Sequence, residues 1–297
     1  MSSKQARTLA IFLAVIGVVL FSAKAVMVKL AYQYEVDPVS LLLLRMVFAL
    51  PIYLIVAIVK RPSHPGQISS KDYLWLILFG IVGYYLASYF DFLGLIYIKA
   101  SLERIILFIY PTLVLIISRI FLGKKIATSQ VFAICISYLG IAITFWAELD
   151  LTGSNVVFGS ILIFLSALTY ACYLVGSGWL IPKFGATTFT SYAMIVSCLA
   201  VAVHFLVLER KDVFNFPIEV YGLSLAMAML STVIPSYLVS AAIKKLGASD
   251  FSIIGSLGPI STIILANLFL DESLTILQLV GTAVVIIGVF IVSRYKS

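Results

Sequence analysis

The sequence has few charged residues. Asp, Glu, Lys and Arg together make up 11% of the 297 residues, whereas about 25% is usual in soluble proteins. Apolar residues make up 62%, against roughly 45 to 50% in soluble chains. A water-facing surface of normal polarity cannot be built from so few charges. Soluble enzymes and soluble DNA-binding domains are therefore excluded.

Histidine and cysteine are also scarce, with two and three residues. The cysteines, Cys135, Cys172 and Cys198, lie inside apolar runs without CxxC spacing or a neighbouring His, which argues against a disulfide framework and against a zinc site. The sequence contains no GxSxG, HExxH or Walker motif. We therefore expect no catalytic residues, no metal, no cofactor and no direct use of ATP.

What the sequence does contain is long apolar segments. A bilayer core needs about 20 apolar residues per helix, and the chain divides into ten such segments, so we predict an all-α polytopic membrane protein. The apolar run after Arg7 has no small-residue cleavage site, so we expect a first span rather than a removed signal peptide. The predicted spans are 8–31, 38–59, 73–96, 99–120, 128–147, 156–180, 187–208, 220–242, 248–269 and 274–294.

The positive charges indicate orientation rather than nucleic-acid binding. The net charge is +7, but Lys and Arg occur in ones and twos between apolar runs and form no stripe. Cytoplasmic loops carry the excess of Lys and Arg. With the N-terminus inside, thirteen of these residues lie on the cytoplasmic side and only Lys99, Arg210 and Lys211 lie outside. We therefore expect a multi-pass protein of the cell (inner) membrane with both termini in the cytoplasm.

The sequence matches itself when it is displaced by 148 residues. Ser88 and Tyr89 then fall on Ser236 and Tyr237, Pro111 falls on Pro259, and Gly140 falls on Gly288. The offset divides the chain into 1–148 and 149–297, with five predicted spans in each. Because five is odd, the second copy enters the membrane inverted. Two inverted five-helix repeats are the architecture of secondary transporters with a site at the repeat interface.

Two long segments carry a family resemblance. LGASDFSIIGSLGPISTIILANLFLDESLTILQLVGTAVVIIGVFIV, residues 246–292, and KASLERIILFIYPTLVLIISRIFLGKKIATSQVFAICISYLGIAI, residues 99–143, resemble the drug/metabolite transporter superfamily, and within it the EamA type. Lys29, Arg45 and Pro51 fit the same pattern. The resemblance covers essentially the whole chain.

The resemblance implies a ten-span carrier whose central cavity is built from spans 1 to 4 and 6 to 9, while spans 5 and 10 stand apart. Members move amino acids and their analogues, nucleotide sugars, sugar phosphates, amines or drugs. This sequence departs from the pattern at two places. Lys124 and Lys125 replace the usual Glu after the fourth span, and Glu103 and Arg104 replace small residues at its start.

Six ionisable side chains fall inside the predicted spans. A charge at the bilayer centre costs about 2.5 to 3.5 kcal/mol or more, so buried charges face a partner or a watery cavity. All six lie in the outer half of the first repeat, and the positions 148 residues later carry no charge. This one-sided arrangement favours an outward-facing vestibule for a polar solute. The six are Lys24, Lys29, Arg45, Asp91, Glu103 and Arg104.

Each of these charges also has a structural interpretation. Lys29 lies within a turn of the helix end, where it would snorkel to the surface. Lys24 is about 140° around the helix from Lys29, so only one of them faces the cavity. Arg45 would pair with Asp91 as a tie between helices. Glu103 and Arg104 are about 100° apart, which lets one face the cavity while the other braces a neighbouring helix.

Polar aromatic residues extend the candidate site. Tyr84, Ser88 and Asp91 share one face of the third span, and Glu103 and Tyr110 share one face of the fourth. Tyr85 and Tyr89 could also supply rings and hydroxyls to a ligand, or lie at the membrane interface, where Tyr is common. His204 and Asn267 are interpreted as structural residues that form hydrogen bonds between helices. The candidate substrate-binding set is therefore Lys24, Arg45, Tyr84, Ser88, Asp91, Glu103, Arg104 and Tyr110.

These patterns predict a secondary transporter that moves a small polar or amphipathic organic metabolite by alternating access. Four positive and two negative intramembrane charges favour an amino acid or an organic anion, and Glu103 is the candidate for proton coupling. A membrane-embedded lipid-modifying enzyme and a non-transporting membrane scaffold are the alternatives. We expect a monomer or a homodimer whose partners are the small-molecule substrate and the lipid bilayer, with no nucleic acid.

The charge distribution makes a testable prediction about orientation. A cysteine introduced at Ser63, in the expected cytoplasmic segment 60–71, will react with a membrane-impermeant thiol reagent only after the cells are opened. A cysteine in segment 209–219 will react in intact cells. Labelling of the Ser63→Cys variant from outside intact cells would show that the expected orientation is wrong.

Overall fold

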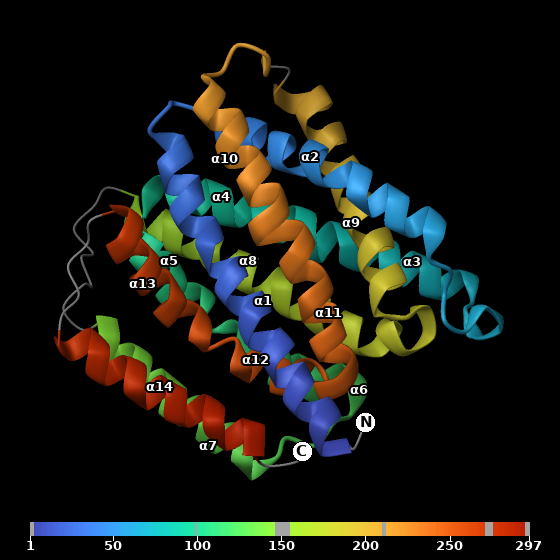
Figure 1. The fold of residues 1–297 in the computed structure, drawn as a ribbon, viewed down its shortest axis with the longest axis vertical. Coiled ribbons are helices and arrows are strands. Elements are labelled where there is room, and N and C mark those ends of the chain that lie inside the picture. Colours follow the sequence, from blue (N-terminus) through green and yellow to red (C-terminus); the bar gives the residue numbers. More distant parts are fainter. Residues whose placement is uncertain (1–2, 99, 146–154, 210–211, 271–275, 295–297) are drawn as a thin grey trace.

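The computed structural model describes residues 3–98, 100–145, 155–209, 212–270 and 276–294. Every element in these residues is helical (Figure 1). Lys99, Arg210, Lys211 and Lys296, which enter the charge count, and Asp271 and Glu272 of the LFLDES segment lie outside the described residues.

The helices of the first sequence half are α1 (Ser3–Tyr32), α2 (Pro38–Val59), η1 (Pro65–Gln67), α3 (Ser70–Gly80), η2 (Ile81–Leu86), α4 (Ala87–Tyr97), α5 (Ala100–Leu107), α6 (Tyr110–Leu122) and α7 (Thr128–Phe145). Those of the second half are α8 (Val156–Phe184), α9 (Ala186–His204), η3 (Phe205–Glu209), α10 (Ile218–Ala228), η4 (Met229–Val233), α11 (Ile234–Leu246), α12 (Ala248–Ile254), α13 (Leu257–Leu270) and α14 (Ile276–Arg294).

The architecture is that of a polytopic membrane protein, as predicted. Within the described residues, seven continuous helical stretches are long and apolar enough to cross a bilayer, and three shorter apolar helices accompany them. In hydrocarbon every backbone N–H and C=O must be satisfied inside the chain, which helices achieve. Large apolar side chains such as Ile58, Phe121 and Ile276 are exposed on the outside of the bundle, where lipid would cover them.

Several spans are interrupted, and three of the interruptions lie within three residues of prolines inside the predicted spans, where the loss of one helix hydrogen bond predicts a kink. These prolines are Pro111, Pro235 and Pro259. The predicted fourth span is divided into α5 and α6, and the ninth into α12 and α13. The third and eighth spans each contain a π-helical turn, η2 and η4. Pro111 and Pro235 lie in the first turn of α6 and α11, where a helix needs no N–H from that residue.

These interruptions recur at the offset found in the sequence. A displacement of 148 residues carries the start of η2, Ile81, onto the start of η4, Met229. It also carries the α5–α6 break onto the α12–α13 break, each of which directly precedes a proline, Pro111 or Pro259. The two halves therefore repeat their irregular backbone features as well as their residues.

Helices α7 and α14 pack together along one edge of the molecule (Figure 1). A β-carbon added at Gly140 would lie 2.7 Å from the Gly281 carbonyl oxygen, and one added at Gly288 would lie 3.0 Å from the Ala133 carbonyl oxygen. The offset of 148 residues carries Gly140 onto Gly288 and Ala133 onto Gly281, so the two contacts are equivalent. Each helix thus presents a glycine to the backbone of the other, in a reciprocal contact.

This contact predicts the effect of adding volume there. Gly140→Val is expected to destabilise the folded protein by about 1 to 3 kcal/mol, because the new side chain meets the α14 backbone, which cannot rearrange cheaply. Gly222→Val on α10 is the matched control, since a β-carbon at Gly222 meets nothing within 4 Å. Thermal unfolding of both variants in detergent measures the difference. Equal melting temperatures would contradict the close packing of α7 on α14.

Candidate functional site

A small cavity lies in the middle of the bundle, between the two sequence halves. Its volume is about 80 Å³, which is room for a few water molecules. The four interruptions related by the 148-residue offset all reach it: Tyr84 comes from η2, Thr232 from η4, Phe108 from the α5–α6 break and Gly255 from the α12–α13 break. Discontinuous helices that meet at mid-membrane are a feature of transporter binding sites.

The lining of the cavity follows the 148-residue offset. In six cases a lining residue of the first half and its counterpart in the second half both face the cavity. The cavity therefore lies where equivalent segments of the two halves meet. The pairs are Val18 with Ser166, Ser22 with Tyr170, Gly83 with Ser231, Tyr84 with Thr232, Leu107 with Gly255, and Tyr110 with Gly258.

Two ion pairs lie on the first-half side of the cavity. The Lys24 Nζ atom is 2.7 Å from Asp91 Oδ2, and the Arg104 Nε atom is 3.0 Å from Glu103 Oε2. Lys24 and Arg104 line the cavity, whereas both carboxylates are 0% exposed and lie behind them. Breaking such a buried pair leaves one charge uncompensated, at a cost of about 3 to 5 kcal/mol. The cavity therefore meets the cationic side of each pair.

The two ion pairs are neighbours, and Asp91 and Glu103 interact electrostatically with each other. Together the pairs join three helices, because Lys24 lies on α1, Asp91 on α4, and Glu103 and Arg104 on α5. These four side chains form one cluster of buried charges.

Arg45 on α2 is the third cation that lines the cavity, and it differs from the other two. Its Nη2 atom donates to Ser88 Oγ at 2.9 Å, and its guanidinium lies 4.8 Å from the ring centroid of Phe92. Asp91 pairs with Lys24 rather than with Arg45. Arg45 is 2% exposed, and among the described residues it has no carboxylate within 4.0 Å and no hydrogen-bond partner for Nε. Arg45 is therefore a buried cation that still has an unused hydrogen-bond donor.

Tyrosine rings form another part of the cavity wall. Tyr84 packs edge-on against Tyr173 with the ring centroids 4.7 Å apart, and Tyr110 packs against Tyr170 at 5.5 Å. Tyr84, Tyr110 and Tyr170 line the cavity, and Tyr173 packs behind Tyr84. The four rings come from both sequence halves. Aromatic faces and hydroxyls next to a guanidinium suit a small solute that has both an apolar part and a charged part.

The structure places most of the expected site residues together. Lys24, Arg45, Tyr84, Ser88, Arg104 and Tyr110 line the cavity, and Asp91 and Glu103 support it from behind. The residues interpreted as structural lie elsewhere. Lys29 donates to the Leu95 carbonyl at 2.6 Å, and His204 Nδ1 is 2.9 Å from the Tyr85 hydroxyl. Asn267 lies on α13 and does not line the cavity.

Several lining residues were missed by the sequence analysis, among them Ser22, Ser166, Tyr170, Ser231 and Thr232. They carry no charge, so nothing marked them as unusual inside an apolar segment. The 148-residue offset contained part of the missing signal, because it carries the predicted site residue Tyr84 onto Thr232. Applied to uncharged positions as well as charged ones, it would have indicated Thr232.

A metal site is not evident in the part of the chain that the structure describes. No group of three or more His, Cys, Asp or Glu side chains there is arranged to hold a metal ion. Asp91 and Glu103 instead form ion pairs with Lys24 and Arg104.

Comparison with known proteins adds independent information. The model of the EamA-like transporter family matches twice, at residues 8–146 and 157–294. The "Uncharacterized transporter YcbK" of Bacillus subtilis is 32% identical over 284 residues, which cover 93% of this chain and 89% of that protein. An "Uncharacterized transporter" of Archaeoglobus fulgidus is 24% identical over 269 residues, which cover 90% of this chain and 93% of that protein.

A solved crystal structure has the same fold. It superposes with a TM-score of 0.75 and 14% sequence identity, and the match covers 95% of each chain. At this identity the likeness concerns the fold alone. The family model matches both halves of the sequence. The two relatives are named as transporters, and the sequence match covers nearly their full length. The chain therefore belongs to the EamA-like transporter family.

Proposed function

We propose that this chain is a secondary carrier for a small organic anion or zwitterion, such as an amino acid, and that Arg45 binds the carboxylate of that solute. The observation that carries this proposal is the state of Arg45. It is a fully buried guanidinium at the cavity wall without a carboxylate partner among the described residues. A guanidinium presents its N–H groups in a planar fork that matches a carboxylate. A solute anion would supply the missing partner.

The other two cavity cations are suited to a supporting role. Lys24 is paired with Asp91, and Arg104 is paired with Glu103. Each cation would attract a solute anion, but neither needs the solute as a partner for its charge. The tyrosine rings would contact the apolar part of the solute. The cavity of about 80 Å³ is small for a whole amino acid, so the proposal requires the two halves to separate around the solute.

The symmetry of the lining supports alternating access. In carriers built from inverted repeats, the site lies at the repeat interface and is exposed in turn to each side by rocking of the halves. Six lining pairs, two π-helical turns and two helix breaks are all related by one offset. We infer that the segments 1–148 and 149–297 are inverted repeats in the cytoplasmic membrane, with both termini in the cytoplasm.

The proximity of Asp91 to Glu103 supports proton coupling as part of this proposal, since two buried carboxylates repel each other. A solute carboxylate at Arg45 would bring a third negative charge near Asp91, because Ser88, which accepts a hydrogen bond from Arg45, lies one turn from Asp91 on α4. Uptake of a proton would offset that charge, so binding of a proton and binding of the anion would assist each other.

The two alternative functions fit this geometry less well. A lipid-modifying enzyme needs a catalytic pair that reaches the membrane interface. Asp91 and Glu103 are 0% exposed and are enclosed by Lys24 and Arg104. A non-transporting scaffold gives no reason for a buried cation without a partner at a cavity, because such a charge costs stability and adds none.

Arg45 provides the first test. We expect Arg45→Gln to weaken binding of the transported anion about 10- to 100-fold, because a hydrogen bond to a charged group contributes about 1.5 to 3 kcal/mol. The solute is first identified by thermal-shift screening of amino acids and organic anions on the purified protein. Uptake into proteoliposomes then measures the effect.

The control for this test is Lys29→Gln, which also removes one positive charge from the outer half of the first repeat but lies outside the cavity lining. Ser88→Ala removes only the hydroxyl that holds the guanidinium, so a smaller loss is expected. A folded Arg45→Gln protein that binds and transports as well as wild type would show that Arg45 is structural.

Glu103 provides the second test. We expect Glu103→Gln to retain solute exchange between the two sides of a proteoliposome but to lose accumulation driven by an imposed pH gradient, because the amide cannot exchange a proton. Solute-driven proton movement is followed with a pH-sensitive dye inside the vesicles. Wild-type behaviour of the Glu103→Gln variant in both measurements would exclude coupling through this carboxyl pair and would leave the solute assignment to Arg45 intact.

A further inference from the structure

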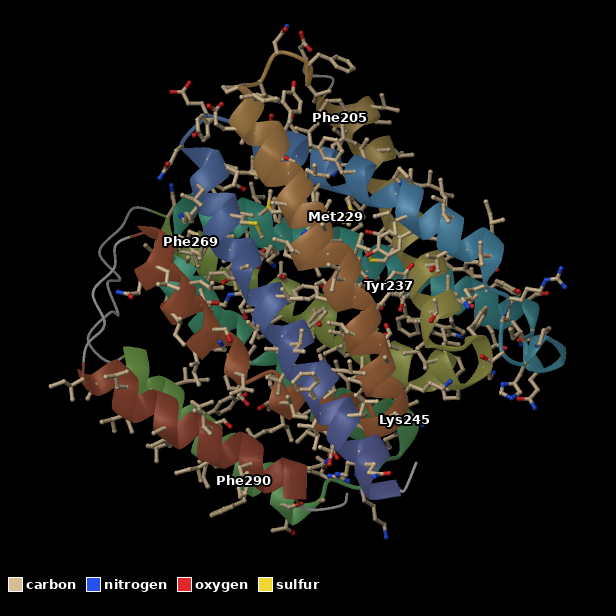
Figure 2. The ribbon with its side chains drawn as sticks, viewed as in Figure 1. Phe205, Met229, Tyr237, Lys245, Phe269 and Phe290 are labelled. Atoms are coloured by element: carbon tan, nitrogen blue, oxygen red, sulfur yellow. The ribbon has the colours of Figure 1, made fainter. Side chains whose placement is uncertain are left out.

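A second cleft lies at the end of the bundle where α1 begins and α11 ends. Its volume is about 650 Å³, much larger than that of the central cavity. Four cations line it, two from each sequence half: Lys60 and Arg61 follow α2, and Lys244 and Lys245 end α11. Figure 2 shows Lys245 at this end of α11, beside the start of α1. The described residues that line the cleft include no Asp or Glu.

Two other cations of the same side are held by carboxylates. Lys183 Nζ is 2.7 Å from Asp72 Oδ1, and Arg7 Nη2 is 3.7 Å from Asp250 Oδ2. In contrast, Lys60, Arg61, Lys244 and Lys245 form no ion pair within 4.0 Å among the described residues. The cytoplasmic excess of positive charge accounts for cations on this side. That excess does not explain why four cations without an ion-pair partner, from two distant segments of the chain, line the same cleft.

The cleft is held in shape by contacts between its walls. Ser63 N donates to the Phe184 carbonyl at 3.0 Å, His64 N donates to the Lys183 carbonyl at 3.1 Å, and the Thr188 hydroxyl donates to the Arg61 carbonyl at 3.1 Å. Gly185 has a φ of +83°, and a side chain there would meet Ser63. The segment that carries Lys60 and Arg61 is thereby fixed against the turn between α8 and α9.

One wall of the cleft is apolar and continues onto the lipid-facing surface. Leu9, Ala10 and Leu13 of α1 line it, and Leu9 is 47% exposed. Phe12 on the same helix is 59% exposed. The expected orientation places this end at the cytoplasmic leaflet. A basic cleft between membrane helices with an apolar side open to the hydrocarbon fits a molecule that has a phosphate group and an acyl chain.

We propose that this cleft binds the phosphate group of an anionic phospholipid from the cytoplasmic leaflet, with the acyl chains along the apolar face of α1. Lys60 and Arg61 on one wall and Lys244 and Lys245 on the other would hold the headgroup between them. The site is separate from the central cavity and does not depend on the function proposed for that cavity.

Lipid binding to the purified full-length protein tests the proposal. Native mass spectrometry and thermal unfolding are measured with phosphatidylglycerol, with phosphatidylcholine of the same acyl chains, and with inorganic phosphate alone. We expect retained phosphatidylglycerol and a raised melting temperature with that lipid only. The double variant Lys244→Gln, Lys245→Gln should weaken the binding about thirtyfold, from a contribution of about 1 kcal/mol per lysine near an anionic surface.

The matched control is the double variant Lys124→Gln, Lys125→Gln. It removes two adjacent exposed lysines from the same side, outside the cleft, and changes the net charge equally. We expect it to bind phosphatidylglycerol as wild type does. If both double variants lost phosphatidylglycerol binding equally, general surface charge would explain the binding, and the proposal would be overturned. Equal stabilisation by phosphatidylcholine, or by inorganic phosphate alone, would overturn the assignment to an anionic lipid.

Discussion

The cost of burying charge inside a membrane bundle organises this structure. The four charged side chains of the cluster are all buried: Lys24, Asp91, Glu103 and Arg104. Separating either ion pair would leave a buried charge without a partner and would destabilise the fold, so the partners must stay in contact. Because Lys24 is on α1, Asp91 on α4 and Glu103 on α5, these three helices must meet at one depth. The cluster therefore fixes how α1, α4 and α5 pack within the first half, and with it the first-half wall of the central cavity.

Much of the fold was readable from the sequence. The second span was predicted at 38–59 and α2 is Pro38–Val59, because Asp37 caps the helix at its start and the apolar run ends at Lys60. Length and hydropathy determine such helices almost alone. The prolines Pro111, Pro235 and Pro259 indicated where three spans are irregular, because a proline removes one helix hydrogen bond. The π-helical turn η2 was not predicted, since it has no proline and depends on packing between helices rather than on the apolar character of the segment.

The candidate site was predictable in its charged residues and less so in their arrangement. A charge inside an apolar run is conspicuous, which is why Lys24, Arg45, Asp91, Glu103 and Arg104 were all identified. The sequence left open whether Asp91 pairs with Arg45. The choice depends on how α1 and α2 are rotated against α4, and that rotation is set by the whole bundle. Hydroxyl residues such as Thr232 escaped notice because they fit a membrane helix without cost.

The reciprocal glycine contact between α7 and α14 has a mechanical consequence. At Gly140 and Gly288 each helix lies so close to the other that sliding along the helix axes would press side chains into backbone. Turning about the contact meets no such resistance. Among the described residues, those of α7 and α14 are absent from the cavity lining, and the two helices lie along one edge of the molecule. If the two halves move relative to each other as proposed above, this close contact is the place where we expect the smallest displacement.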